Sequence, residues 1–300
     1  AKFSKTSGRL VISGAGRTSI TATQAATDDY VAAAKSFVLT VKKGTPELGA
    51  FDDISRTFGD AGFTLAKPTS DSRGAITLSS SNPAVATVDG ASGAVSIVGA
   101  GTATITATQS ASGNYSSSSV AAVVTVGRVA TTIANLSLSN LTYGASDVTL
   151  APRSNNPSPF TFSTSSPNVL AVNATTGRVT VVGAGTATIT VSQASSANYE
   201  AGSESLTVQI GRATPTLSSF SAVSKDYGDA PFSLTPPESD SPAPFTYESS
   251  APTVASINST TGVVTILNVT AVGSPVTLTV RQAQTDNYAA ITATTTLIVG

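Results

Sequence analysis

Glutamine and tyrosine recur at matched places in this sequence, and both side chains could do chemistry there. Each glutamine ends a run of small and β-branched residues and a tyrosine follows six residues later: Gln24, Gln109, Gln193, Gln282, Tyr30, Tyr115, Tyr199 and Tyr288. A row of tyrosines could stack on sugar rings, and a glutamine could form an ester crosslink with a threonine. Alternatively, each tyrosine packs over the end of a domain core with its hydroxyl bonded to backbone, and each glutamine satisfies backbone groups at a strand end. We favour the structural alternatives for both sets.

Acidic residues raise the question of calcium, which binds several clustered oxygens. The candidates are Asp52, Asp53, Asp60, Asp226 and Asp229. The acid of "FGDAGF" (58–63) is replaced by Ala145 in the matching "YGASDV", and the places where repeats join carry Lys or Arg. A repeated calcium site is therefore not expected.

Two other kinds of site are also disfavoured. Glu238 and Asp240 could be a pair of catalytic acids, but they lie in a proline-rich stretch that reads as a solvated loop. A Lys–Asn isopeptide crosslink needs a core lysine in each repeat. Lys67 aligns with Arg153 and with no lysine further on, so this crosslink is not expected.

The composition removes most catalytic chemistry. The 300 residues include no Cys, His, Met or Trp, and the formal net charge is −1. Without histidine and cysteine there is no usual general base, no thiol nucleophile, no zinc cluster and no disulfide. Charged residues make up 11 % of the chain, too few for the basic stripe of a nucleic-acid surface, and no apolar run reaches the roughly 18 residues of a membrane span. We expect no enzyme activity, cofactor, metal, nucleic acid or membrane span.

A long internal repeat organises the chain. "VGAGTATITATQ" (98–109) returns as "VVGAGTATITVSQ" (181–193) and, more loosely, as "ISGAGRTSITATQ" (12–24). Matching positions lie 84 or 85 residues apart, and a repeat at a fixed spacing indicates consecutive copies of one structural unit. We predict domains at 43–127, 128–211 and 212–300, preceded by the C-terminal half of a truncated domain at 1–42; these segments are called the first, second, third and partial repeat below.

The segments within a repeat predict strands. "FTFSTS" (160–165) and "RVTVV" (178–182) alternate with period two, and no segment carries a helical stripe. Glycine precedes the next strand in "DGASG" (89–93) and "NATTG" (173–177), as hairpins with a residue at positive φ require. About seven short strands in roughly 85 residues indicate an immunoglobulin-type antiparallel sandwich. The predicted fold is all-β, a tandem row of such sandwiches in an elongated array.

Glycine marks the place where the chain passes from one sheet to the other. The Gly-Ala-Gly residues form what we call the arch of each repeat, and they are anchored by Gly14, Gly99, Gly101, Gly183 and Gly185. We expect these glycines to supply the backbone angles of the crossing. "ILNVTAVGSPVTLTV" (266–280) replaces the arch of the third repeat with four extra residues, which predicts a longer arch near 267–275 and unchanged facing of Val276–Val280.

Residues 80–109, "SSNPAVATVDGASGAVSIVGAGTATITATQ", resemble the bacterial immunoglobulin-like domain, group 2. That family occurs in tandem in large surface adhesins, in intimin- and invasin-like proteins and in some phage structural proteins. The resemblance implies an extracellular or cell-surface segment that extends a binding tip, with neighbouring Ig-like domains of one longer chain, and other subunits of a fibre, as its partners. The alternative is a structural protein of a phage virion or an extracellular filament.

The partial repeat predicts an incomplete sandwich. It would expose one face of a core and unpaired strand edges to water. We expect the missing strands to come from earlier sequence of the same polypeptide or from a neighbouring subunit by strand addition, and to cover Leu10, Ile12, Ile20 and Val38.

Overall fold

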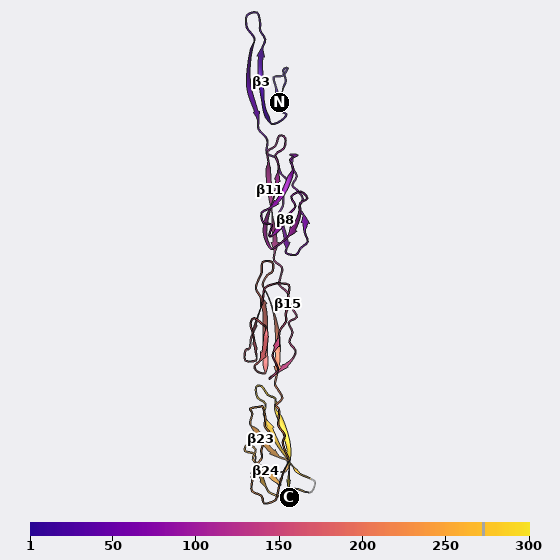
Figure 1. Cartoon of the computed structure of the whole chain (residues 1–300), viewed down its shortest axis with the longest axis vertical. Helices are drawn as coiled ribbons and strands as arrows, with labels where there is room; N and C mark the ends of the chain where they lie inside the picture. Colours follow the sequence, from indigo (N-terminus) through magenta and orange to yellow (C-terminus); the bar gives the residue numbers. More distant parts are fainter. Residues whose placement is uncertain (272–273) are drawn as a thin grey trace. The chain divides into compact units, whose positions relative to one another are not determined.

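The fold is all-β, as the sequence predicts. The computed structural model describes residues 1–271 and 274–300, and every regular element in that part of the chain is a strand. The chain forms two compact units, Ala1–Ala130 with Ser195–Glu200, and Thr131–Ala194 with Ala201–Gly300. In the complete repeats of each unit the strands form the paired sheets of a sandwich (Figure 1).

The partial repeat, in the first unit, has two separate antiparallel pairs. They are β1 (Lys2–Phe3) with β2 (Leu10–Val11), and β3 (Gly16–Gln24) with β4 (Ala33–Val41). Large apolar side chains remain exposed on them, with Ile12 at 57 % and Phe37 at 60 %. The pairs correspond to the last four strands of a sandwich, which agrees with the C-terminal half that the sequence predicts.

The first repeat, also in the first unit, has two sheets. One has the order β5 (Ile54–Thr57), β11 (Ser118–Gly127), β10 (Gly101–Gln109), β7 (Ile76–Ser80), and the other has β6 (Phe63–Thr64), β9 (Ala94–Ile97), β8 (Ala86–Val88). Figure 1 labels β11 and β8, one from each sheet. The pairing is antiparallel except that β5 lies parallel to β11, a detail that the prediction of antiparallel sheets did not include.

The second unit holds the same arrangement twice. In the second repeat, the first sheet has the order β13 (Leu141–Thr142), β20 (Gly202–Gly211), β19 (Gly185–Gln193), β16 (Phe160–Thr164). The second sheet has the order β14 (Val148–Thr149), β18 (Arg178–Val181), β17 (Leu170–Val172). A small separate pair consists of β12 (Ile133–Ala134) and β15 (Arg153–Ser154). In the third repeat, one sheet has the order β21 (Val223–Lys225), β27 (Ile291–Val299), β26 (Val276–Gln282), β23 (Phe245–Ser249). The other sheet has the order β22 (Phe232–Ser233), β25 (Val263–Ile266), β24 (Ala255–Ile257). The edge strands β13 and β21 are again parallel to their neighbours.

Alternation along the central strands builds each core. On β10, Ala103, Ile105 and Ala107 are buried and lie in one cluster with Val124 and Val126 of β11. Full burial of a side chain such as Ile105 contributes about 1.5–3 kcal/mol. This face is fixed because a shift of one residue would turn every apolar side chain to solvent.

The third repeat keeps the same facing behind its longer loop. Val276, Leu278 and Val280 are buried, as predicted. The predicted longer arch at 267–275 includes residues 272–273, which lie outside the described part of the chain. The described part of this loop is tied to β27, because Thr270 Oγ1 donates a hydrogen bond of 3.0 Å to the Val299 carbonyl.

One predicted core residue of the partial repeat was misplaced by a single position. The β3–β4 register pairs Gly16 with Val41, and the β10–β11 register pairs Gly101 with Val126. Leu39 therefore corresponds to the buried Val124, and Val38, 58 % exposed, lies on the outward face. Because side chains alternate along a strand, an error of one residue in the alignment assigns a side chain to the wrong face of the sheet.

Candidate functional site

The recurring glutamines of the complete repeats are buried and bonded to backbone. Gln109 Nε2 donates to the carbonyls of Ser72 (3.1 Å) and Gly74 (2.9 Å), and its Oε1 accepts from Ser70 Oγ at 2.6 Å. Gln282 makes the equivalent contacts with Ser239, Ser241 and Ala243. The glutamine amide thus closes the loop that leads into the neighbouring strand. The hydroxyl that bonds to the glutamine is that of a serine, whereas the ester crosslink considered from the sequence involves a threonine.

Gln193 differs from the other two glutamines, and Gln24 has no such loop. Gln193 Nε2 donates to the carbonyls of Asn156 (3.0 Å) and Ser158, whereas its buried Oε1 has no hydrogen-bond partner in the described residues. Gln24 is exposed on the partial repeat.

Two of the recurring tyrosines contact an aromatic ring of the preceding repeat. Tyr199 meets Phe58 edge-to-face, with ring centroids 5.9 Å apart and an interplanar angle of 75°. Tyr288 meets Tyr143 in the same way, at 5.4 Å and 74°. Such pairs contribute roughly 0.5–1.5 kcal/mol beyond the area they bury.

The other two tyrosines lie elsewhere. Tyr115 bonds to the side chain of Asp71, and this hydrogen bond together with the negative charge raises the pKa of the Tyr115 hydroxyl. Its partner is thus a carboxylate, whereas the sequence prediction was a backbone group. Tyr30 is 73 % exposed.

In each complete repeat, the residue before the recurring tyrosine makes a contact that the sequence did not predict. Oδ1 of Asn198 accepts a hydrogen bond of 2.9 Å from the N–H of Ala100, in the arch of the preceding repeat. The same bond, with the same length, joins Asn114 to Ala15 and Asn287 to Ala184. The signal was present, because "GNY", "ANY" and "DNY" keep the asparagine while the residue before it changes. In the partial repeat this position is Asp29.

The same asparagines also hold the linkers. The N–H of Gly44, Val129 and Ala213 donates to the backbone carbonyl of Asn114, Asn198 and Asn287, at 2.8, 3.0 and 2.9 Å. The linker carbonyl accepts in turn from the residue after the tyrosine, so each linker forms a short parallel bridge with its own repeat. Arg128 and Arg212 add a bond from Nε to the carbonyls of Ala197 and Thr285. We call each Asn–Tyr pair a corner; a corner, its linker and the preceding arch form a junction.

The two glycines of the arch have different roles, which corrects the sequence interpretation. Gly101 and Gly185 have φ of 138° and 145°, so they supply the backbone angle as expected. Gly99 is not at positive φ. A Cβ on Gly99 would lie 2.8 Å from the Ala84 carbonyl oxygen and 3.3 Å from Asn198 Oδ1, and Gly14 and Gly183 approach their asparagines as closely. The first glycine is therefore a close-approach residue.

The acidic candidates serve as turn and strand contacts. Asp60 accepts from the N–H of Thr57 and Asp229 from that of Asp226, while Asp53 accepts from Val123. Across the described ranges, no three His, Cys, Asp or Glu side chains are grouped to hold a metal ion. Asp240, in the proline-rich loop, accepts from the N–H of Thr216.

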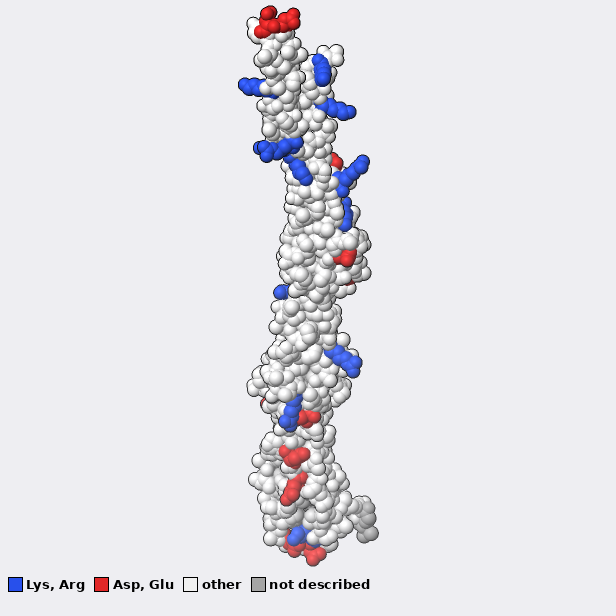
Figure 2. All heavy atoms as spheres, turned by 45° about the horizontal axis from the view of Figure 1, so that its top comes forward, with Lys and Arg blue, Asp and Glu red and all other residues white. Residues whose placement is uncertain are grey.

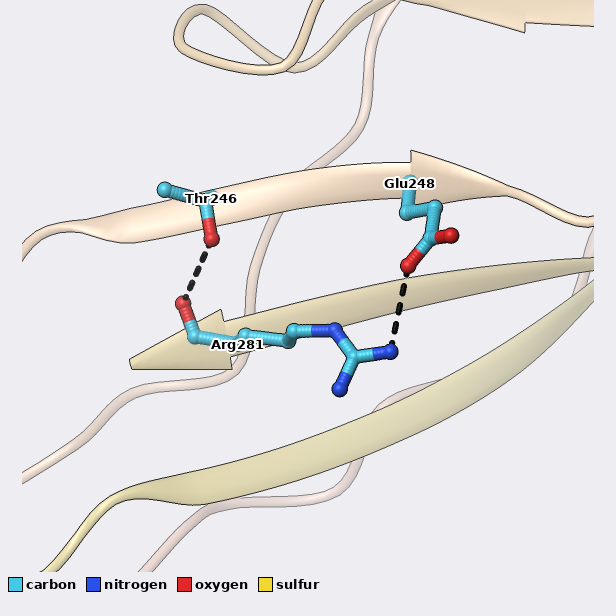
Figure 3. A network of polar contacts seen from close by, with 3 residues as sticks. All are labelled: Thr246, Glu248 and Arg281. Atoms are coloured by element: carbon cyan, nitrogen blue, oxygen red, sulfur yellow. Dashed lines mark hydrogen bonds and ion pairs between the residues drawn. The ribbon is translucent and has the colours of Figure 1, made fainter. Parts of the chain in front are cut away.

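Charged side chains on the surface are sparse. Figure 2 shows a face that is mostly uncharged, with Lys, Arg, Asp and Glu as separate spots. One cross-strand pair lies on the third repeat, where Arg281 Nη2 contacts Glu248 Oε2 at 3.1 Å and Thr246 Oγ1 donates to the Arg281 carbonyl (Figure 3). Both charged side chains are more than half exposed, so this pair contributes little to stability.

Two segments match a family model, and whole-chain similarities are weak. Residues 61–112 and 153–195 match the model of the intimin immunoglobulin-like domain. The chain is 14 % identical to Drosophila N-cadherin EC1-3 (84 % of this chain, 99 % of that chain, TM-score 0.35) and 13 % identical to Sidekick-1 immunoglobulin domains 1–5 (97 % and 67 %, TM-score 0.32). No curated protein sequence matches.

Each matched segment carries strands and turns of one of the sandwiches described above. The matching model is the intimin one, so the group 2 label stays a prediction. In the described residues, no helix has the length and apolarity to cross a membrane. Residues 61–112 of the first repeat and 153–195 of the second are thus similar to the bacterial immunoglobulin-like domain of intimin.

Proposed function

We propose that this chain is a non-catalytic structural segment of a bacterial cell-surface adhesin or fibre, in which tandem Ig-like sandwiches extend a binding tip. The repeated junction carries this proposal. The asparagine and tyrosine of its corner recur in every complete repeat, whereas the acids that could do other chemistry, such as Asp60, are not found in all three. A chain whose recurring side chains serve the join between repeats is suited to holding domains in series.

The matched family supports an extracellular, adhesion-type role. Intimin is the protein named by the model that matches residues 61–112 and 153–195. Ig-like domains from such a protein favour the cell surface as the location and neighbouring Ig-like domains as the partners of this chain.

Single-molecule extension tests the structural part of the proposal. Pulling the chain from its two ends should unfold the complete repeats one at a time. Each event should release about 85 residues, or roughly 300 Å of contour length at about 3.5 Å per residue. A single event that releases the whole chain would contradict a series of separate sandwiches.

Labelling tests the location. An antibody against the first repeat should label intact bacteria that make the parent protein, and protease added outside the cells should remove the label. Label confined to purified virions would instead support the structural protein of a phage.

A further inference from the structure

An aromatic residue begins the same tight turn in each complete repeat. The three are Phe58, Tyr143 and Tyr227, and each is followed by a glycine with φ of 89°, 81° and 98°. The backbone N–H of the aromatic residue donates in each case to the carbonyl of the glycine at the end of the repeat's last strand or directly after it, Gly127, Gly211 or Gly300, at 2.9 Å. The backbone that presents the ring is therefore the same in all three repeats.

Two of these rings are covered and the third is not. Phe58 and Tyr143 are half-buried and contact the corner tyrosines Tyr199 and Tyr288. Tyr227 is 63 % exposed, and no ring contacts it within the described residues. Because its turn already has the geometry of the occupied sites, covering Tyr227 requires little ordering of the chain.

We infer that the surface around Tyr227 is a docking site for the Asn–Tyr corner of one further Ig-like repeat, joined covalently behind Gly300. This inference rests on the proposed function as a series of sandwiches and names the contact that would continue it. Tyr227 takes the part of Phe58 and Tyr143, and the incoming tyrosine packs edge-to-face on it.

The linker explains why the occupant is a covalently joined repeat. In the two occupied junctions the chain leaves Gly127 or Gly211, and the second residue onward, Val129 or Ala213, pairs with the corner tyrosine. This short path delivers the corner to the ring just left behind. Val299–Gly300 repeats the ending Val126–Gly127, so the same path starts at the third repeat.

A second copy of this chain is a poorer occupant. The matching place in its partial repeat carries Asp28 and Asp29 beside Tyr30, while Asp226 and Asp229 flank Tyr227. Bringing these four carboxylates together would oppose association, because like charges at an interface are repulsive. A corner of the type Asn114–Tyr115 or Asn198–Tyr199 brings a neutral asparagine.

The proposed contact is the ring half of a junction. The hydrogen bond from an arch N–H to asparagine is not part of it, because the longer loop at 267–275 replaces Gly-Ala-Gly in the third repeat. The docked tyrosine is therefore the side chain on which the contact should depend.

Tyrosine nitration of the full chain and of a lengthened chain tests the inference. The lengthened chain carries a second copy of residues 212–300 behind Gly300, with Tyr227→Phe in the added copy so that only one Tyr227 is followed. We expect the nitration rate of Tyr227 to fall several-fold, toward that of Tyr143, while Tyr30 is unchanged. Tyr288→Ala in the added copy should return Tyr227 to its rate in the natural chain.

Three outcomes would overturn the inference. One is an unchanged Tyr227 rate when the added repeat is folded, as judged by its own unfolding transition. If that repeat fails to fold, a copy of residues 128–211 with Tyr143→Phe replaces it, and an unchanged rate there has the same meaning. Protection of Tyr227 by raising the concentration of the natural chain would assign the site to a second copy. In each case Tyr143 stays protected by Tyr288, so the proposed function would stand.

Discussion

The side-chain oxygen of Asn198 accepts a hydrogen bond from the backbone N–H of Ala100, 98 residues earlier in the chain, at 2.9 Å. Asn198→Ala removes this acceptor and leaves a half-buried N–H without its partner. We expect the free energy of unfolding of the first unit to fall by about 0.5–1.5 kcal/mol, measured by urea denaturation. Asn198→Asp keeps an oxygen at the same place and should restore most of the loss. Equal losses for both variants would mean that the hydrogen bond is not the cause.

Gly99→Ala tests the close approach at the arch. The added Cβ would lie 2.8 Å from the Ala84 carbonyl oxygen, so either the arch or the turn before β8 must shift. Overpacking of this kind costs roughly 1–3 kcal/mol, and thermal unfolding would report it. Gly127→Ala is the matched control, because its nearest atom, the Arg56 carbonyl oxygen, is 3.7 Å away. A Gly99→Ala variant as stable as this control would refute the close-approach role.

Gln109→Leu should lower the free energy of unfolding of the first repeat, although the leucine side chain is similar in size to that of glutamine. The change leaves the carbonyls of Ser72 and Gly74 without the amide donor. Each buried group that loses its partner costs about 1–3 kcal/mol. Gln24→Leu, at the exposed equivalent in the partial repeat, should leave denaturant unfolding unchanged. A crosslink between Gln109 and Ser70 would appear instead as a loss of 17 Da, the mass of ammonia, from the intact chain.

Asp89 should make the free energy of unfolding of the first repeat depend on pH in the acid range. Hydrogen bonds from the Ser92 hydroxyl and N–H lower the pKa of Asp89 below its usual value of 3.8. Since the folded pKa is depressed, this contribution is present above pH 3.8 and is lost as the pH falls through the folded pKa. Asn173 and Asn258 cap the matching turns of the other repeats, so Asp89→Asn should retain the turn and remove this part of the acid dependence. Urea unfolding at neutral and acid pH would measure it.

The partial repeat should close when the strands it lacks are provided. We propose adding a copy of residues 43–85, which carries the equivalents of β5, β6 and β7, in front of Ala1. Amide hydrogen exchange across β3 and β4 should then slow to the level of β10 and β11, because Ile20 and Leu39 become part of a core. Unchanged exchange would mean that this segment does not complete the sandwich.

The sequence predicted the sheets well because strand periodicity and turn glycines are local signals. Ile105 and Leu278 face the core as the alternation requires, and Gly101 has the positive φ that the arch required. The parallel edge strand β5 was not predictable in this way. It has only four residues, and its direction follows from pairing with β11 about 70 residues later in the sequence.

The junction was harder to predict, because its contacts join residues of different repeats. Tyr199 was recognised as a recurring residue, but its partner Phe58 lies in another copy of the motif. The sequence does not single out Asn198, since an asparagine next to a turn is common. Its recurrence is visible in the sequence, whereas its acceptor role depends on the arch of another repeat.

Among the described residues, the contacts that a corner makes outside its own repeat are with the repeat immediately before it, and this has a consequence for how such genes change. Duplication or loss of a whole repeat like the second one recreates the asparagine hydrogen bond and the ring pair at the new boundary. The length of the chain can therefore change without compensating substitutions. A copy of the third repeat is different. Its longer loop at 267–275 carries no Gly-Ala-Gly, so a copy inserted inside the chain would not repeat the arch sequence that receives the following asparagine, and we expect expansion to occur through the other repeats.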